Sequence, residues 1–325
     1  MLFRSHRNNS IDKDSFSPAI LEIGSYQSKT ENLSNTWHLM QAEGNPPIAK
    51  WVEWQDLGST FDFKLHASPI SAAQNLAQTL WSTSSAAVLT SATLRTLGDF
   101  QYFLNQTGLN WFPKTNTFEA ESPFNYEDQG TFVVPEMVQC PSANAEGHTQ
   151  ELSTEIPKQL DDLQHGALVL FTSKKQMKQV YEDLPNEFLQ DVLMQGDMPR
   201  NQLIKNHESR INQGQRSILF GMQSFGEGLD LPGKMCEVVV ITKLPFAPPD
   251  SPIEEAKAEW LEKNQGNPFY EISVPAVALK LQQWVGRGIR TETDHAKIVV
   301  LDKRLRTKPY GKKLLAGLPP FKRLM

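Results

Sequence analysis

The sequence predicts an α/β fold in which helices alternate with the strands of a parallel sheet. From about Glu151 onward, short apolar runs alternate with amphipathic segments of helical period, which is the pattern of strand–helix units. The chain has 325 residues, of which 39% are hydrophobic and 21% are charged. That length suffices for one large domain or two smaller ones.

The second half of the chain supplies most of the expected elements. Helices are expected after Ser173, a residue suited to a helix N-cap, and over residues 200–212. Each expected strand is a short apolar run bounded by turn residues. These strands span residues 167–171, 191–195, 217–222, 237–242 and 298–302.

The first half is less regular. Residues 1–50 mix polar residues and proline without periodicity, so we expect irregular structure there or the remnant of an upstream domain. Residues 50–57 and 60–66 alternate in the manner of a β-hairpin. A short apolar run at 86–90 predicts a buried strand. It ends at Ser91.

Four segments therefore divide the chain. Proline, glycine and asparagine are frequent between 109 and 150, which we interpret as a connector with one strand-like patch at 131–134. The segments are 1–50, 51–108, 109–150 and 151–325.

Charge and cysteine content narrow the function classes. The net charge is -5, yet the chain from Arg290 onward contains ten basic residues and three acidic ones. A basic end attracts phosphate backbones, although it is also what a solvated terminus looks like. The two cysteines are far apart, so neither a zinc site nor a disulfide framework is expected. No apolar run is long enough for a membrane span, and a cytoplasmic protein is expected.

The segment from Gln283 to Arg290 carries the pattern Q-x-x-G-R-x-x-R. The guanidinium groups of Arg287 and Arg290 stay charged and present a planar fork, which suits the charge that develops on a transferring phosphoryl group. In a helix the two arginines point to one side, and Gly286 lets another backbone approach. A surface helix with two solvated arginines is the alternative.

A glycine-rich loop, Ser224–Gly233, follows the strand expected at 217–222. Loops at the carboxyl ends of parallel strands are where α/β folds place ligand-binding backbone, and Asp230 can accept hydrogen bonds from a ribose or an arginine. Glycines that serve a tight turn alone are the alternative. Gly228 and Gly233-Lys234 have P-loop spacing, but Met235 offers no hydroxyl to Mg²⁺ and a strand is expected to follow.

Two shorter segments hold hydroxyl side chains. Ser91-Ala92-Thr93 ends the run at 86–90, where hydroxyls can relay between a nucleotide site and a neighbouring lobe. Thr172-Ser173 lies at a helix start, where hydroxyls can bind a nucleic-acid phosphate. Both segments are equally compatible with ordinary strand ends and a plain N-cap.

Superfamily 2 helicases have four motifs, III, IV, V and VI, that segments of this chain resemble in order and spacing. The segments are, in that order, Ser91-Ala92-Thr93, Thr172-Ser173, the glycine-rich loop and the Q-x-x-G-R-x-x-R segment. Other segments are similar to the DinG type of ATP-dependent DNA helicase, in the XPD-like group. These are Glu121-Ser122-Pro123-Phe124-Asn125, Gln195-Gly196-Asp197, Gly221-Met222-Gln223-Ser224-Phe225, Asp250-Ser251-Pro252 and Asp302-Lys303-Arg304-Leu305. The resemblance covers about residues 50–325. Residues 151–325 would form the second RecA-like lobe, and residues 51–108 the end of a first one.

The resemblance implies a 5′ to 3′ translocase that unwinds forked DNA and binds single strands, with ATP and Mg²⁺ between two lobes. By position, Gln283, Arg287 and Arg290 would face the γ-phosphate. The remaining roles fall to residues that contact the nucleotide (Glu227, Gly228, Asp230 and Gly286), couple hydrolysis to movement (Ser91, Ala92 and Thr93) or bind DNA (Thr172, Ser173 and Ser224).

The sequence departs from the family in several respects. The P-loop, the Asp-Glu box and the cysteines of any iron–sulfur cluster are expected in an upstream lobe, so this chain alone is expected to be inactive. Trp284 and Gly288 replace residues usual in motif VI, and a glycine there is expected to loosen a helix.

A second hypothesis is a non-catalytic module that binds single-stranded DNA or a protein partner, with some of the seven tryptophans as stacking surfaces. A metabolic enzyme is disfavoured because the seven histidines are scattered singly and no nucleophile–base pair is present.

Overall fold

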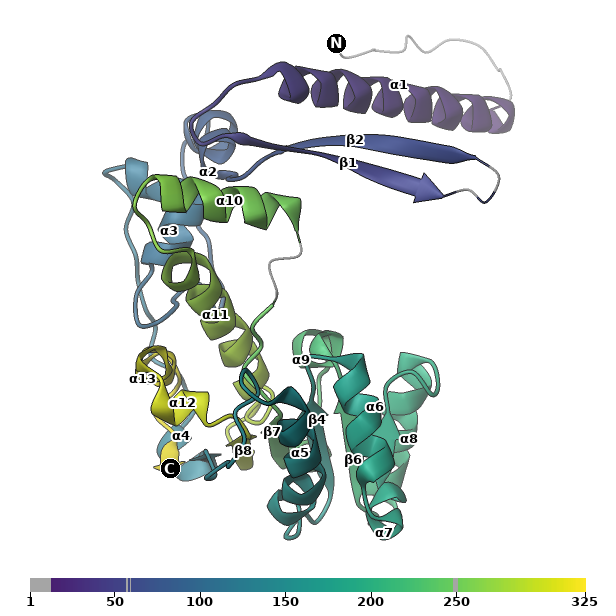
Figure 1. Cartoon of the computed structure of the whole chain (residues 1–325), viewed down its shortest axis with the longest axis vertical. Helices are drawn as coiled ribbons and strands as arrows, with labels where there is room; N and C mark the ends of the chain where they lie inside the picture. Colours follow the sequence, from purple (N-terminus) through teal and green to yellow (C-terminus); the bar gives the residue numbers. More distant parts are fainter. Residues whose placement is uncertain (1–12, 57, 59, 248–250) are drawn as a thin grey trace. The chain divides into compact units, whose positions relative to one another are not determined.

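The computed structural model describes residues 13–56, 58, 60–247 and 251–325, apart from the side chains of 13–19, 227 and 228 (Figure 1). The chain forms two compact units. One consists of residues up to Ala72 together with Pro249–Gly266, and the other of Ala73–Pro248 together with Asn267–Met325.

The first unit is built around a β-hairpin. Strands β1 (Ile48–Asp56) and β2 (Phe61–Pro69) pair antiparallel, with Trp54 opposite Phe63. The predicted hairpin is therefore confirmed. Helix α10 (Pro252–Lys263) belongs to the same unit, and its Trp260 indole N–H donates to the Asn45 side chain at 2.9 Å.

A helix occupies residues for which we expected irregular structure. Helix α1 spans Lys13–Gln41, so irregular structure is wrong for most of the first fifty residues, whereas the alternative, a remnant of an upstream domain, stays a prediction. Apolar side chains such as Leu21, Leu33 and Trp37 are exposed on it. Because the helix does not bury one apolar stripe, its sequence shows no helical period.

The second unit contains a seven-stranded sheet with the order β5-β6-β4-β7-β8-β3-β9. Every neighbouring pair in it is parallel. All five predicted strands are present to within one or two residues at most ends. The strands are β3 (Gly130–Val133), β4 (Gly166–Leu170), β5 (Val192–Met194), β6 (Ser217–Gly221), β7 (Val238–Ile241), β8 (Ala296–Val300) and β9 (Lys322–Leu324).

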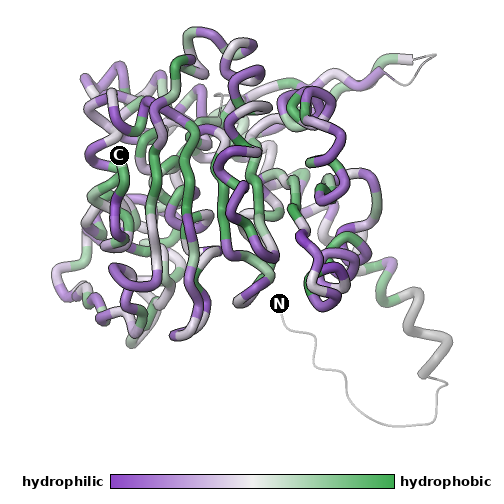
Figure 2. Tube along the Cα trace, turned by 90° about the horizontal axis from the view of Figure 1, so that it is seen from below, coloured by the Kyte–Doolittle hydropathy of each residue, from purple (hydrophilic) through white to green (hydrophobic). Residues whose placement is uncertain are grey.

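Helices cover both faces of this sheet, so its central strands are apolar on both sides (Figure 2). On one face the strands pack with Leu281 and Trp284, and on the other with Leu152 and Met177. The longer helices are α5 (Ala145–Gln159), α6 (Lys174–Asp183), α8 (Arg200–Asn212), α11 (Val274–Val285) and α13 (Pro309–Ala316). The shorter ones are α2 (Ala73–Leu76), η1 (Ala77–Trp81), α3 (Gln101–Thr107), η2 (Leu109–Trp111), α4 (Tyr126–Gln129), α7 (Asn186–Leu189), α9 (Gln223–Gly228), η3 (Gly233–Met235), η4 (Phe269–Ser273) and α12 (Arg304–Thr307).

No helix within the described ranges is long and apolar enough to pass through a membrane.

The strand expected at residues 86–90 is not formed. Val88 is 93% exposed, and the segment pairs with no strand among the described residues. An apolar run forms a buried strand only when a sheet offers it a neighbour. The strand-like patch at 131–134, by contrast, is β3 of the large sheet, so part of the expected connector belongs to the core.

Two histidines lie fully buried in this unit. His207 on α8 contacts the Ser217 hydroxyl through Nδ1 at 2.8 Å and the Met235 carbonyl through Nε2 at 2.9 Å. His148 on α5 contacts the Leu301 carbonyl through Nε2 at 2.8 Å. Burial lowers the pKa of both imidazoles, so both are neutral in the folded protein.

We predict that acid destabilises the second unit through these two groups. Below the ordinary histidine pKa of about 6.5, these two imidazoles bind protons in the unfolded chain but stay neutral in the folded one. Stability is therefore present above that pH and is lost as the pH falls below it. Urea unfolding midpoints between pH 7.5 and 5.5 should drop, and the drop should shrink in His207→Gln. An equal drop in that variant would contradict the prediction, and His295→Gln, at an exposed position, is the matched control.

Candidate functional site

The two arginines of the Q-x-x-G-R-x-x-R segment converge on one backbone carbonyl. Arg287 donates from Nε to the Gly226 carbonyl at 2.6 Å and from Nη1 to the Leu229 carbonyl at 2.5 Å. Arg290 donates from Nη2 to the same Leu229 carbonyl at 3.3 Å, and its Nε lies 3.8 Å from an oxygen of Asp230. Asp230 thus forms a long ion pair with an arginine, and the hydrogen bond expected of it stays a prediction.

We expected the two arginines to lie on a helix, and they do not. Helix α11 ends at Val285, with Gly286 as its C-cap, and Arg287 and Arg290 follow in a loop. Gly286 is exposed, and a Cβ there would meet only carbonyl oxygens of the preceding helical turn. The close backbone approach expected at Gly286 is therefore not formed within the described chain.

Close approach occurs instead at two other glycines. A Cβ at Gly226 would lie 2.2 Å from the indole nitrogen of Trp284, which is buried on α11. A Cβ at Gly288 would lie 2.7 Å from the Cβ of Ala296 at the start of β8. The tryptophan and the glycine that depart from the family pattern therefore fit the segments they contact. Because α11 ends before Gly288, the expected loosening of a helix there does not arise.

The loop that carries Arg290 closes on a buried carboxylate. Asp294, 5% exposed, accepts the Arg290 and Thr291 N–H groups at 2.8 and 2.9 Å and the Thr291 hydroxyl at 2.7 Å. It also accepts the N–H of Gly233. Burial raises the pKa of Asp294, but these hydrogen bonds together lower it by more, so the pKa stays below its ordinary value.

The glycine-rich loop itself has a mixed outcome. Glu227 and Gly228 end helix α9, and their side-chain placement lies outside the described residues. After them, Gly233–Met235 forms a single 3-10 turn that leads into strand β7. A strand rather than a helix thus follows the P-loop-like spacing, as expected. Gln283 lies partly exposed in the last turn of α11.

The expected DNA-contact residues lie at the carboxyl ends of neighbouring strands. Thr172 and Ser173 follow β4, and Ser224 follows β6, which is the next strand in the sheet. Ser173 caps α6, as predicted, by accepting the Gln176 N–H. Gln195, after β5, accepts the N–H of Met222 at 2.7 Å and donates to the Ser224 hydroxyl at 3.1 Å.

The coupling segment stands apart in its contacts. Ser91 and Ala92 are exposed, and the Ser91 hydroxyl lies 3.3 Å from both the hydroxyl and the N–H of Thr93. These are contacts of a local turn. Nothing in them bears on a relay between lobes, which stays a prediction.

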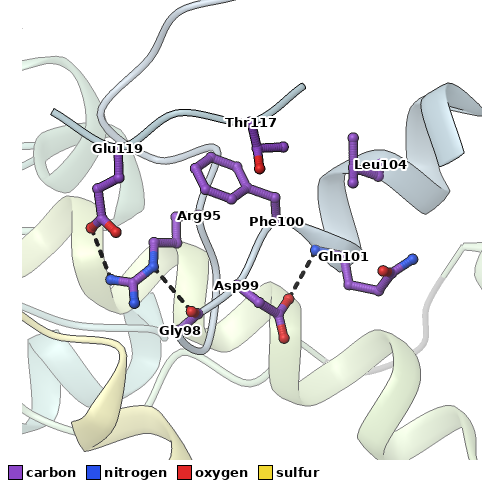
Figure 3. A pocket seen from close by; sticks show the side chains of 8 residues that line it. All are labelled: Arg95, Gly98, Asp99, Phe100, Gln101, Leu104, Thr117 and Glu119. Carbon is purple, nitrogen blue, oxygen red and sulfur yellow. Dashed lines mark hydrogen bonds and ion pairs between the residues drawn. The ribbon is translucent and has the colours of Figure 1, made fainter. Parts of the chain in front are cut away.

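A shallow pocket of about 530 Å³ follows this turn (Figure 3). The Arg95 guanidinium donates to a carboxylate oxygen of Glu119 at 2.9 Å and to the Gly98 carbonyl at 3.0 Å. Asp99 accepts the Gln101 N–H at 2.8 Å. The basic side chain that lines the pocket, Arg95, is thus already paired with the carboxylate of Glu119.

Two features escaped the sequence analysis. Asp294 stands in a run of polar residues typical of a solvated loop. Near the carboxyl ends of β7 and β8, the Phe246 and Phe269 rings stack at 5.7 Å, and the Arg304 guanidinium lies 5.2 Å from the Phe246 ring. The same guanidinium is paired with the buried carboxylate of Asp302 at 2.7 Å, so this aromatic–basic cluster ties the chain after β8 to the chain after β7. The basic count after Arg290 was the signal for its cationic part.

Comparisons with known proteins agree on one family. The family model of the helicase C-terminal domain matches residues 156–321. The ATP-dependent DNA helicase DinG of Photobacterium profundum is 39% identical over 327 residues, which cover 98% of this chain and 46% of that protein. DinG of Escherichia coli K12 is 36% identical, with 93% and 43% covered. The chain thus spans less than half the length of these relatives.

Solved structures support the fold. An apo XPD structure is 17% identical with a TM-score of 0.55, covering 82% of this chain and 55% of that one. An XPD helicase structure is 17% identical with a TM-score of 0.54, covering 82% and 48%. The expected RecA-like lobe is confirmed by these likenesses and by the parallel sheet. That residues 51–108 end a first lobe stays a prediction.

We predict that adding a methyl group at Gly226 or Gly288 destabilises the second unit. Gly226→Ala pushes against Trp284 and Gly288→Ala against Ala296, and overpacking of this kind costs about 1–3 kcal/mol. Thermal and urea unfolding measure the loss. Gly24→Ala is the control, because this glycine lies inside α1 with open space where its Cβ would stand. Unchanged midpoints in both test variants would contradict the packing argument.

Proposed function

Because this chain belongs to the helicase C-terminal domain family, we propose that it is the second motor half of a cytoplasmic, ATP-dependent DNA helicase that moves 5′ to 3′ on single strands. It contributes positive charge to an ATP whose phosphates and Mg²⁺ are held mainly by another lobe. In this proposal the chain is inactive by itself, and its partners are that lobe and single-stranded or forked DNA.

The convergence of Arg287 and Arg290 on the Leu229 carbonyl carries the proposal. It sets two permanent charges side by side at a loop of the sheet, where they can stabilise the charge on a γ-phosphoryl group. Gln283 lies in the last turn of α11, four residues before Arg287. Arginine at such a position acts only when a phosphate cradle is brought to it.

The two arginines differ in how firmly they are held. Arg287 makes two short hydrogen bonds to backbone carbonyls, whereas Arg290 makes one long one and a loose ion pair with the exposed Asp230. A long contact and a solvated partner are readily exchanged for a phosphate. We therefore assign the phosphate contact mainly to Arg290, and to Arg287 the task of holding the Gly226–Leu229 segment in place.

The other family positions fit around this pair. Asp230, which is exposed beside Arg290, can accept a ribose hydroxyl or release the arginine when a nucleotide arrives. For Glu227, Gly228 and Gly286 the nucleotide contact rests on family position alone. Ser91, Ala92 and Thr93 are assigned to coupling on the same ground. No group of three or more His, Cys, Asp or Glu in the described ranges is placed to hold a metal ion.

We assign DNA binding to the carboxyl edge of the sheet. The hydroxyls of Thr172, Ser173 and Ser224 lie there on neighbouring strands, and Gln195 orders the loop that carries Ser224. Hydroxyl groups and N–H groups of this kind bind phosphate oxygens of the backbone without reading the sequence. Binding should therefore tolerate any base.

A second candidate, a non-catalytic module that binds single-stranded DNA or a partner, is favoured by one observation on the hairpin. Trp54, Phe61 and Phe63 are all more than half exposed, and the register sets Trp54 opposite Phe63 on one face. Such a face suits a protein or a base stack. If the chain bound DNA equally well after Trp54→Ala and Phe63→Ala, the module would lose its support from the hairpin.

We predict no DNA-stimulated ATPase from the chain alone, and activity when it is mixed with the N-terminal half of a DinG relative that carries a P-loop and an Asp-Glu box. Arg290→Ala should lower kcat of the mixture about a hundredfold with little loss of stability. Arg287→Ala should also lower the free energy of unfolding by about 1–3 kcal/mol, because backbone acceptors lose their donors. Arg290→Lys is the control for charge without the fork. Hydrolysis by the chain alone would contradict the proposal.

We predict that Thr172→Val combined with Ser224→Ala weakens single-stranded DNA binding several-fold, and that affinity falls steeply with salt. Fluorescence anisotropy with a labelled oligothymidine measures both. Ser173 is left in place because it caps α6. The exposed Ser209→Ala on α8 is the matched control and should bind as the wild type does. Equal affinities for all three proteins would move the DNA site away from this edge.

A further inference from the structure

The loop between α11 and β8 is organised by one buried side chain. A single oxygen of Asp294, Oδ2, accepts the N–H groups of both Arg290 and Thr291, at 2.8 and 2.9 Å. Its other oxygen, Oδ1, accepts the Thr291 hydroxyl at 2.7 Å. A carboxylate that is 5% exposed requires such donors, because an unpaired buried charge is strongly disfavoured.

The carbonyl groups of the same loop are held by a second buried side chain. Gln129, 7% exposed at the end of α4, donates from Nε2 to the carbonyls of Thr291 and Asp294, at 3.2 and 2.9 Å. The N–H groups and the carbonyls of the loop are thus both tied to buried side chains. Its backbone has little freedom, even though Thr291, Glu292 and Thr293 are themselves exposed.

Asp294 also reaches the glycine-rich loop. It accepts the N–H of Gly233, which begins the turn η3 just after the segment that carries Leu229 and Asp230. One carboxylate therefore joins the backbone of Arg290 to the end of the glycine-rich loop, which the Arg290 guanidinium also contacts. Both the backbone and the side chain of Arg290 are thus linked to this loop.

We propose that Asp294 is a positioning residue, which sets the backbone of Arg290 so that its guanidinium stays beside Leu229 and Asp230, ready to meet a phosphate. The proposal rests on the proposed function for the phosphate itself. The link from Asp294 to Arg290 can be tested without any nucleotide. Asp294 makes no contact with substrate in this account and acts only through the arginine.

Hydrogen exchange in the full chain tests the link directly. In Asp294→Ala, the amides of Arg290, Thr291 and Gly233 should exchange about tenfold faster or more, because each loses a charged acceptor. Asp294→Asn is the second variant and guards against simple unfolding. Its single side-chain oxygen can keep the two bonds that Oδ2 makes to the Arg290 and Thr291 N–H groups, while its NH₂ group replaces Oδ1, which accepts the Thr291 hydroxyl. In that variant the Arg290 and Thr291 amides should stay protected.

Glu292→Ala is the matched control, because it removes an exposed acid from the same loop. It should leave all three amides protected. Unchanged exchange at Arg290 in Asp294→Ala would overturn the proposal, whatever the chain does with ATP. Faster exchange across the whole sheet in both Asp294 variants would also overturn it, since a general loss of structure is not positioning.

The ATPase of the mixture with an N-terminal half tests the consequence. Asp294→Ala should lower kcat, and the double variant with Arg290→Ala should be no slower than Arg290→Ala alone, because the aspartate acts through the arginine. Combined with Gln283→Ala, its effect should instead add. Additive losses with Arg290→Ala would overturn the proposal. If the wild-type mixture hydrolyses no ATP, the proposed function fails, and the exchange experiment alone decides whether Asp294 positions Arg290.

Discussion

The carbonyl oxygen of Leu229 accepts hydrogen bonds from two guanidinium groups, and the arrangement of the candidate site depends on this shared acceptor. Two like charges side by side repel each other unless negative partial charges lie between them. The Leu229 carbonyl, the Gly226 carbonyl and the nearby Asp230 provide these. Segments about sixty residues apart in sequence thereby form one charged surface. Beneath it, the ring of Trp284 lies against Gly226 and sets how closely the two segments approach.

The two proposed activities use different parts of one lobe. The hydroxyl groups lie where β4 and β6 end, whereas the arginines lie in the chain that leads from α11 back to the start of β8. Helix α9 connects the two regions, because it begins beside Ser224 and ends just before Leu229. A displacement of this six-residue helix would therefore move both Ser224, which Gln195 contacts, and the carbonyls that accept from the arginines.

How much of this was predictable follows from what each segment needs in order to fold. Strands such as β4, with five consecutive buried residues, are apolar because both sheet faces are covered, and that pattern is visible in the sequence. Strand β9 is Lys-Arg-Leu with exposed side chains, and only its pairing with β3 makes it a strand. The run at 86–90 has the apolar pattern but no neighbour. Helix α1 has no apolar stripe, so its period was invisible.

The candidate site, like the fold, could be predicted from the sequence only in part. The arginine spacing identified Arg287 and Arg290, but a three-residue spacing does not require a helix, and the side chains meet through Leu229 instead. Asp294 was not identified because one aspartate among polar residues forms no pattern, and its importance lies in its burial and in the donors that the fold brings to it, Gly233 among them. Residue types that carry chemistry are thus visible in a sequence, whereas the residues that hold them in place depend on contacts that only the fold creates.

The order of the strands also sets an order of folding. Strand β3 is made before strands β4 to β7, yet both of its neighbours, β8 and β9, are made after them. Strands β4, β5 and β6 can pair as soon as they emerge, whereas β3 must wait for partners of high contact order. During translation the apolar Phe132 of β3, fully buried in the finished sheet, has no strand to pair with. Until β8 is made, β3 therefore offers an apolar, unpaired strand, which is the kind of surface through which folding intermediates misassemble.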